Sequence, residues 1–290
     1  IAGEEPVKGL LLSLDGKNGE FRLFAPDFPD WIEDDGVGIK LAPDTRTNSI
    51  MKKVVTEIEN NKPLFRLFEQ LHDGKETGIN ERSEQILEGA VDLSTTKLNL
   101  SQQQAVEAIL KAHPFTIVHG PPGTGKTTTL AEGISQLVRR GEKVLVAAPS
   151  NTAVDNISKA LLKKGIKILR VGNTSKVDPE IFRHTPEGNL ANGNAQKEIK
   201  QLKIRAEEFR RMALKYKRSF GKAEREQRNL LFKEVKSIRA EIKKIQAYNE
   251  EKLLTEAEVI AGTPIGLYDA DLNNLHFQSL FIDEAGQCIE

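Results

Sequence analysis

The chain has 290 residues, of which 38% are hydrophobic, and its 42 Lys and Arg residues balance 42 Asp and Glu residues. This length exceeds that of a usual single domain, so we expect at least two structural units. No run approaches the ~20 apolar residues that cross a bilayer, and the first residues do not form a secretory signal. The single cysteine, Cys288, excludes an internal disulfide and a multi-cysteine zinc site. We therefore expect a cytoplasmic protein, or a nuclear one in a eukaryote, without membrane partners.

The first candidate elements are three short runs of β-type sequence at residues 9–14, 20–24 and 37–41. Gly, Asp and Pro residues interrupt them, as is typical of short strands and turns. Trp31 lies in this strand-rich region, where packing is the favoured interpretation over stacking on a nucleic-acid base.

A glycine-rich segment at residues 120–127 reads GPPGTGKT and matches the phosphate-loop pattern G-x-x-x-x-G-K-[ST] at every required position. An apolar run at residues 115–118 precedes it and a helix-compatible run at 128–138 follows it, which predicts a strand, a loop and a helix. The glycines let successive N–H groups surround phosphate oxygens, and the following helix directs its positive end at the same anion. We favour a nucleoside triphosphate site over a glycine-rich turn without a ligand.

Each residue type in this loop has an expected role. Lys126 is expected to reach the β- and γ-phosphates and to act in catalysis, and the Thr127 hydroxyl is expected to coordinate Mg²⁺. The residues assigned to ATP binding in this segment are Gly120, Pro121, Pro122, Gly123, Thr124, Gly125, Lys126, Thr127 and Thr128.

Residues 143–148 form a β-branched run that predicts a buried strand of a parallel sheet. A helix is expected to follow, through about residue 164. Ser150 and Asn151 are good capping residues for that helix. A second interpretation stays open, because a helix N-terminus with Ser, Asn and Thr can also bind a phosphate of a nucleic-acid strand.

A basic segment occupies residues 196–252, with 18 Lys or Arg against 9 Glu and no Asp. Apolar residues recur at spacings of three and four before Gly221, up to Tyr216 and Phe220, and again after it, which predicts two antiparallel helices. One interpretation is a solvated coiled-coil spacer, and the other is a clamp on a phosphate backbone. The sequence alone leaves both open.

Short strands are also expected at residues 166–171, 258–261 and 280–282, and the last ends in Asp283-Glu284. This order is typical of a carboxylate that holds Mg²⁺ beside a catalytic base, so Asp283 is assigned to the metal and Glu284 to polarising the attacking water. Strands alternating with helices predict an α/β fold, a RecA-like phosphate-loop parallel sheet with helices on both faces. The nucleotide is expected at the carboxyl ends of the strands.

Four motifs together resemble superfamily 1B helicases of the upframeshift and immunoglobulin-mu-binding-protein type. They are LNLSQ at residues 98–102, GPPGTGKT at 120–127, APSNTAVD at 148–155 and DEAGQ at 283–287. The resemblance covers residues 46–290.

The resemblance implies further residue roles. Gln102 matches a glutamine that recognises adenine, and Gln287 matches one that links the ATP site to the nucleic-acid site. Nucleic-acid contacts are implied for Ser150, Asn151, Thr152 and Thr263.

It also implies a domain organisation. A β-barrel accessory domain, too short here to close, would occupy residues 1–45, and a helical stalk 46–95, supplied by residues 48–71 and 81–87. The RecA-like ATPase domain would comprise 96–186 and 253–290, with the basic hairpin inserted at 187–252 as a nucleic-acid-facing element. The family's second RecA-like domain would follow residue 290, so we expect a fragment that alone hydrolyses ATP slowly.

The function implied is the N-terminal motor half of an ATP-dependent DNA or RNA helicase that moves 5′ to 3′ on single strands. Its cofactors would be ATP and Mg²⁺, and we expect a monomer. Two alternatives stay open: an ATP-gated nucleic-acid clamp that remodels complexes without separating strands, and a kinase-like NTPase without nucleic acid.

Overall fold

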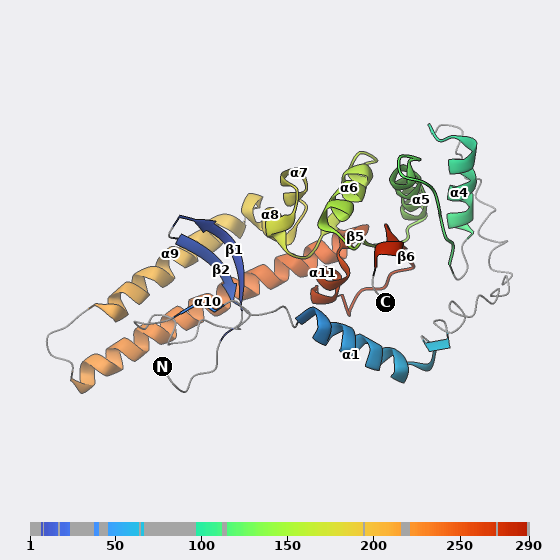
Figure 1. The fold of residues 1–290 in the computed structure, drawn as a ribbon. Helices are drawn as coiled ribbons and strands as arrows, with labels where there is room; N and C mark the ends of the chain where they lie inside the picture. Colours follow the sequence, from blue (N-terminus) through green and yellow to red (C-terminus); the bar gives the residue numbers. More distant parts are fainter. Residues whose placement is uncertain are drawn as a thin grey trace. The chain divides into compact units, whose positions relative to one another are not determined.

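The computed structural model describes residues 7, 9–16, 18–23, 38–40, 46–63, 65–66, 97–111, 115–193, 195–215, 221–270 and 272–288. The chain divides into two compact units, Ile1–Phe68 and Glu69–Glu290, and each is described by itself (Figure 1). The finer division into residues 1–45, 46–95, 96–186 with 253–290, and 187–252 stays a prediction.

The described residues of the first unit include an antiparallel hairpin and helix α1 (Arg46–Asn60). Strand β1 (Gly9–Asp15) pairs with β2 (Asn18–Leu23), with an irregularity in register between Leu11 and Ser13. The expected third strand at residues 37–41 is wrong at Gly38–Lys40, which are exposed and form no strand. Trp31 and residues 81–87 lie outside the described residues, so their predictions are untested.

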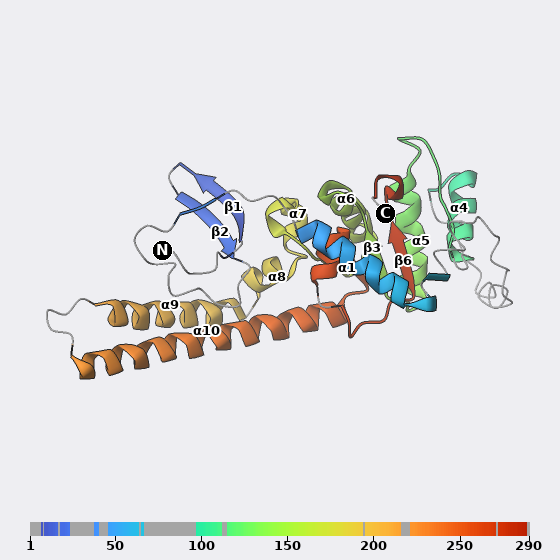
Figure 2. The same ribbon diagram turned by 60° about the horizontal axis from the view of Figure 1, so that its bottom comes forward.

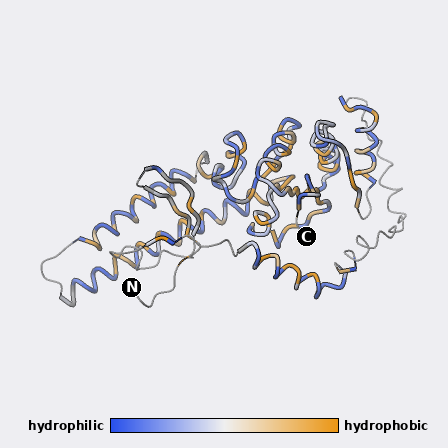
Figure 3. The backbone as a smooth tube through the Cα atoms, viewed as in Figure 1, coloured by the Kyte–Doolittle hydropathy of each residue, from blue (hydrophilic) through white to orange (hydrophobic). Residues whose placement is uncertain are grey.

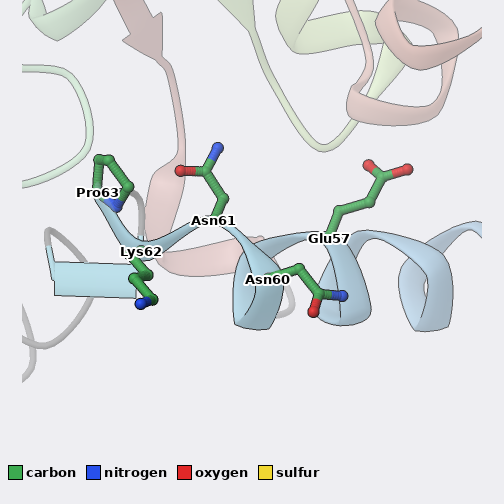
Figure 4. A pocket seen from close by; sticks show the side chains of 5 residues that line it. All are labelled: Glu57, Asn60, Asn61, Lys62 and Pro63. Atoms are coloured by element: carbon green, nitrogen blue, oxygen red, sulfur yellow. The ribbon is translucent and has the colours of Figure 1, made fainter.

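Helix α1 (Arg46–Asn60) supplies part of the expected stalk. Its half-buried residues recur at helical spacing, as a one-sided helix requires: Thr47, Ile50, Met51, Val54 and Ile58. An open depression lies at its carboxyl-terminal end (Figure 4), where the lining side chains point in different directions instead of converging. We assign no ligand to it.

The second unit is built on a four-stranded parallel sheet of order β4-β5-β3-β6. The strands are β3 (Val144–Ala147), β4 (Ile168–Arg170), β5 (Val259–Gly262) and β6 (Ser279–Ile282). Central strand β3 pairs Val144 with Val259 on one side and with Ser279 on the other. Because all strands run in one direction, the residues that follow them lie along one edge of the sheet.

Helices cover both faces of this sheet, which confirms the predicted α/β class. Alternate side chains of β3 enter different clusters: Val144 and Val146 pack with α4 (Leu100–Leu110), α5 (Lys126–Arg139) and α6 (Asn151–Leu162). Leu145 and Ala147 pack with the end of α10 (Lys222–Glu256) and with α11 (Pro264–Asp269). A strand covered on both faces needs apolar residues throughout, which is why its sequence lacks polar alternation.

Shorter elements connect β4 to the helical insertion. They are η3 (Thr174–Lys176), α7 (Pro179–Phe182) and α8 (Pro186–Asn192), and η4 (Ala285–Gln287) follows β6. Both α7 and α8 begin with a proline after a capping side chain, from Asp178 and Thr185 respectively. Proline is favoured at the first helical position because its missing N–H has no partner there.

The basic segment forms two helices, α9 (Ala195–Leu214) and α10, which lie side by side in both views (Figures 1 and 2). Gly221 precedes α10 and its N–H donates to the Glu224 carboxylate. The predicted apolar stripes meet, since Ile199 and Ala206 form a buried cluster with Ile238 and Ile242. Figure 3 shows that hydrophilic residues predominate along both helices. Tyr216 and Phe220, expected in the stripe, lie outside the described residues.

Lys143 connects the end of this hairpin to the sheet. Its Nζ donates to the carbonyl of Leu254 at 2.7 Å and of Thr255 at 2.9 Å, in the last turn of α10. Burial lowers the pKa of Lys143. The ammonium group thus satisfies two carbonyls that a helix end leaves without partners, one residue before β3 begins.

A partly buried ion pair ties α5 to the end of α6. The Glu132 side chain is 4% exposed and accepts hydrogen bonds from Lys164 and from Gln136, the latter at 2.7 Å. Burial alone would raise the pKa of Glu132, but the hydrogen bonds from Lys164 and Gln136 outweigh it and hold the pKa below its usual value. The carboxylate therefore stabilises the fold in its ionised form.

The predicted strand at residues 115–118 is wrong. These residues pair with no strand, and Phe115 and Ile117 are 46% and 80% exposed. Within the described sheet, β6 has β3 as its only neighbour, and its Leu280 is 58% exposed. A strand needs a ladder partner, so the β-type sequence at 115–118 forms no strand.

No helix within the described ranges is both long and apolar enough to cross a bilayer.

Candidate nucleotide site and nucleic-acid edge

The loop before α5 has the backbone shape that its sequence predicts. Gly123 and Gly125 both have φ of +82°, a conformation that other residues rarely adopt. A Cβ at Gly125 would also meet Gln102 Nε2 at 2.6 Å. Among the described residues, no protein acceptor is found for the backbone N–H groups of Gly123, Gly125, Lys126 and Thr127. These donors lie at the positive end of α5, so the loop fits a phosphate group.

Lys126 turns back over this loop. Its Nζ donates to the carbonyl of Gly120 at 2.8 Å and of Pro121 at 3.2 Å. Thr124 Oγ1 also donates to Pro121 O, at 2.8 Å. Pro122 and Thr128 are exposed and Thr127 is half-buried. The roles of all these residues toward a nucleotide stay predictions.

Gln102 contacts the phosphate loop directly. Its Nε2 donates to Thr124 O at 3.0 Å, while its Oε1 accepts from the Asn99 N–H at 3.0 Å and completes a capping box at the start of α4. The structure therefore places Gln102 beside the loop, where its amide hydrogen-bonds the loop and the start of α4. Recognition of adenine by this amide stays a prediction.

Asp283 follows β6 and lies in the same site as Lys126. The Asp283 residue is 5% exposed, and its backbone N–H donates to Ala147 O at 2.9 Å, which fixes it at the end of β3. Burial raises the pKa of Asp283, and the hydrogen bond from the Glu284 N–H and, to a smaller extent, the positive charge of Lys126 oppose that rise. Among the described residues, the Lys126 ammonium itself donates to loop carbonyls and forms no ion pair with Asp283, so their joint action at one nucleotide stays a prediction.

Glu284 and Gln287 complete the turn after β6. Glu284 has φ of +53°, the only positive φ of a non-glycine residue in the described segments, which is a strained backbone conformation. Its N–H donates to Asp283 Oδ1 at 3.0 Å, and its exposed carboxylate accepts from Gln287 Nε2 at 3.2 Å. The turn thereby holds a buried carboxylate and an exposed one next to each other.

The same residues fit a magnesium ion bound with a phosphate. Mg²⁺ is usually held by one or two protein oxygens together with substrate phosphate oxygens and water. Asp283 and Thr127 offer a carboxylate and a hydroxyl of that kind. Among the described residues, no three or more His, Cys, Asp or Glu side chains lie close enough together to bind a metal ion. Protein ligands alone would therefore not complete the coordination of a metal at this turn.

The residues predicted to contact nucleic acid follow β3 and β5 on the same edge of the sheet. Ser150 caps α6 by accepting from the Ala153 N–H at 3.2 Å, and Thr263 caps α11 by accepting from the Gly266 N–H at 3.2 Å. Asn151 is half-buried and Thr152 is exposed. The capping interpretation is thus confirmed for Ser150, and contact with a strand stays a prediction for all four.

Comparison with known proteins matches this geometry to a family. The family model described as "AAA domain" matches residues 97–290. "DNA polymerase alpha-associated DNA helicase A" of Schizosaccharomyces pombe is 31% identical over 242 residues, 83% of this chain and 36% of that protein. "DNA-binding protein SMUBP-2" of Mus musculus is 35% identical over 67% of this chain and 19% of that protein. "ATP-dependent helicase upf1" of S. pombe is 32% identical over 67% of this chain and 20% of that protein.

The chain belongs to the superfamily 1B helicase family of the upframeshift and immunoglobulin-mu-binding-protein type. The matched region contains the phosphate loop, the sheet and the turn after β6. This superfamily 1B chain spans about a third or less of the length of these three relatives.

One residue that contacts a candidate site residue was missed in the sequence. Arg170, the last residue of β4, is 1% exposed and its Nη2 donates to Asn151 Oδ1 at 2.7 Å. A lone arginine inside the apolar run Ile168-Leu169-Arg170-Val171 was the available signal, because a buried strand rarely carries an unpaired charge.

We expect the Asp283→Asn variant of this superfamily 1B chain to be more stable than the natural chain without nucleotide and magnesium. Asn keeps the oxygen that accepts from the Glu284 N–H but removes a buried charge, so the free energy of unfolding should rise by about 0.5–2 kcal/mol. The raised pKa of Asp283 means that this gain is full above the folded pKa and disappears as the pH falls below the unfolded pKa.

Urea unfolding at pH 7 and at acid pH measures this gain. The exposed Asp15→Asn variant is the control and should stay within about 0.5 kcal/mol of the natural chain. An Asp283→Asn chain that is less stable at pH 7 would show that the carboxylate is a net stabilising group.

Proposed function

We propose that the chain is the N-terminal motor half of an ATP-dependent helicase that moves 5′ to 3′ along single-stranded DNA or RNA. The observation that carries this proposal is the phosphate loop before α5, whose N–H groups at residues 123 and 125–127 have no protein acceptor among the described residues. The names of the relatives, which include two helicases and a DNA-binding protein, support it.

The residues divide the work at the nucleotide. The N–H groups of the loop and the Lys126 ammonium would hold the phosphates, and Thr127 and Asp283 would hold Mg²⁺. A bound Mg²⁺ ion neutralises developing charge on the phosphate oxygens. The exposed Glu284 carboxylate would orient the attacking water and accept its proton, and the hydrogen bond from Gln287 would fix its position. A second RecA-like domain would supply the remaining charge by closing on this face.

The nucleic-acid strand would lie across the carboxyl edge of the sheet. Ser150, Asn151, Thr152 and Thr263 follow β3 and β5 there, so their hydroxyl, amide and backbone donors could bind phosphates without reading bases. The basic helices α9 and α10 would add a phosphate-facing surface.

The basic hairpin itself favours a second candidate, an ATP-gated clamp that remodels nucleic-acid complexes without separating strands. Helices α9 and α10 carry Lys and Arg residues along their whole length. Such a surface can hold a phosphate backbone without unwinding it.

An ATPase assay of the full-length protein, with and without oligo(dT) or oligo(U), tests both nucleic-acid candidates. We expect stimulation by a single strand that is lost in the Lys126→Ala variant. ATP hydrolysis that ignores both polymers would support a kinase-like NTPase and contradict the proposal.

A strand-separation assay then divides the motor from the clamp. Duplexes with a 5′ or a 3′ single-stranded tail should be unwound only from the 5′ tail. Polymer-stimulated hydrolysis without unwinding of either substrate would favour the clamp.

A further inference from the structure

The buried guanidinium group of Arg170 contacts the turn after β3. Arg170 ends edge strand β4, and its side chain is 0% exposed. Its backbone is fixed as well, because its N–H donates to His184 O at 2.8 Å and the next N–H, of Val171, donates to Ala261 O at 2.9 Å. A buried charge is tolerated only when it has hydrogen-bond partners, so the contacts of the Arg170 side chain indicate its role.

The first partner neutralises the charge. Arg170 Nε donates to Asp155 Oδ1 at 3.0 Å, and the other carboxylate oxygen of Asp155 accepts from the Asp178 N–H at 2.8 Å. Asp155 lies on the buried side of α6, four positions after Asn151. The Arg170–Asp155 pair therefore fixes the first turns of α6 against β4.

The second partner is a residue predicted to bind nucleic acid. Arg170 Nη2 donates to Asn151 Oδ1 at 2.7 Å. A guanidinium has donors and no acceptor, so it selects the amide oxygen and turns the Asn151 NH₂ group away from itself. In the part of the chain that the structure describes, no acceptor is found for that NH₂ group. Its two donors remain for an external acceptor at the start of α6.

The third partner reaches the neighbouring turn. Arg170 Nη1 donates to the carbonyl of Val171, which precedes Gly172. Gly172 has φ of +111° and packs closely on α11, since a Cβ at Gly266 would meet Gly172 Cα at 3.0 Å. Gly266 is the residue whose N–H donates to Thr263. The Arg170 guanidinium thus bonds to Asn151 in the turn after β3. It also bonds to Val171 O, next to the glycine that packs against the turn after β5.

We propose that Arg170 is a positioning residue that orients the Asn151 amide to donate to a phosphate of a single nucleic-acid strand. The inference rests on the proposed function, because it needs a strand at the carboxyl edge of the sheet. Arg170 itself touches no strand, and it acts by holding Asn151 Oδ1.

Three substitutions separate the roles. Arg170→Lys keeps a positive charge for Asp155 and removes the planar fork that reaches Asn151. Asn151→Ala removes the proposed donors. Asn151→Asp keeps an oxygen for Arg170, and so keeps the fold, but offers no N–H and adds a negative charge.

The measurement is fluorescence anisotropy of labelled oligo(dT) and oligo(U) with this chain, beside a thermal melt of each variant. We expect each substitution to weaken binding about tenfold, as loss of a hydrogen bond to a charged group does. The Arg170→Lys, Asn151→Ala double variant should bind no more weakly than Asn151→Ala alone, because Arg170 acts through Asn151. Lys159→Met is the control. It removes the surface ion pair of Lys159 with Asp178, at 2.7 Å in the adjacent segment, and should leave binding unchanged.

The outcomes tell the two proposals apart. If the natural chain does not bind, or if both Asn151 variants bind as it does, the predicted strand contact is wrong and both proposals fail at this site. If the Asn151 variants lose affinity while Arg170→Lys does not, or if the losses are additive in the double variant, the inference on Arg170 is overturned and the proposed function stands. A purely structural arginine would lower the melting temperature and leave the affinity of folded chains unchanged.

Discussion

Glu284→Gln should lower the rate of ATP hydrolysis by about 10²–10⁴-fold, the range for removal of a general base. The amide keeps the size of the side chain and can still contact Gln287, but it cannot accept a proton from water. ATP affinity should change little, because the phosphate-binding N–H groups and Lys126 are untouched. Steady-state ATPase kinetics of the full-length protein with a single-stranded polymer, together with fluorescent ATP-analogue binding, measure the two effects separately.

The matched control is Glu251→Gln, which removes an exposed carboxylate from α10 and should leave the rate unchanged. Parallel loss of ATP affinity and rate in Glu284→Gln would mean that Glu284 holds the turn after β6, a role that its positive φ would also suit. An unchanged rate would remove Glu284 from the chemistry altogether.

Lys164→Met should lower the free energy of unfolding by about 1–3 kcal/mol at pH 7, the cost of removing one hydrogen-bond partner from a buried polar group. The substitution leaves the Glu132 carboxylate, whose side chain is 4% exposed, with Gln136 as its remaining hydrogen-bond donor. Lys163→Met removes an exposed lysine from the adjacent position and should cost less than about 0.5 kcal/mol. Urea unfolding of both variants measures the difference.

The stability difference between the natural chain and Lys164→Met should depend on pH. In the natural chain the pKa of Glu132 is lowered, so its contribution is full above the unfolded value of 4.5 and is lost as the pH falls through the folded pKa. Without Lys164, burial should raise the pKa of Glu132 instead, and protonation of Glu132 should remove the cost of burying its charge. The gap between the two chains should therefore narrow toward pH 4, and adding Glu132→Gln to Lys164→Met should narrow it at pH 7. A gap that is independent of pH would assign the loss to packing of the lysine side chain.

The sequence predicted the elements whose signal is local. Strands β3 and β5 were visible because burial on both faces demands continuous apolar residues, and β4 and β6 were visible as short apolar runs. The hairpin was visible because its apolar residues recur at helical spacing. The phosphate loop was visible because only glycine adopts the backbone that it needs at residues 123 and 125. Each of these patterns lies within a short window.

The features that were missed depend on contacts between distant residues. Arg170 and Asp155 are 15 positions apart, and Lys164 and Glu132 are 32 apart, so no periodicity joins them. The error at residues 115–118 has the same origin, because a β-type sequence forms a strand only where a neighbour offers a ladder. The packing role of Gln102 on the loop, through Thr124 O, also needed the tertiary structure.

The 35 residues of α10 form one uninterrupted helix, about 52 Å long at 1.5 Å per residue. Gly221 precedes its first residue, and near its other end Lys143 donates to the carbonyls of Leu254 and Thr255. Those two hydrogen bonds join α10 to Lys143, the residue before β3, and β3 runs directly into the turn that holds Asn151. The end of α10 also packs on Leu145 and Ala147 through Leu254, and the chain continues from it into β5, so a displacement of the hairpin would reach the sheet by several contacts at once.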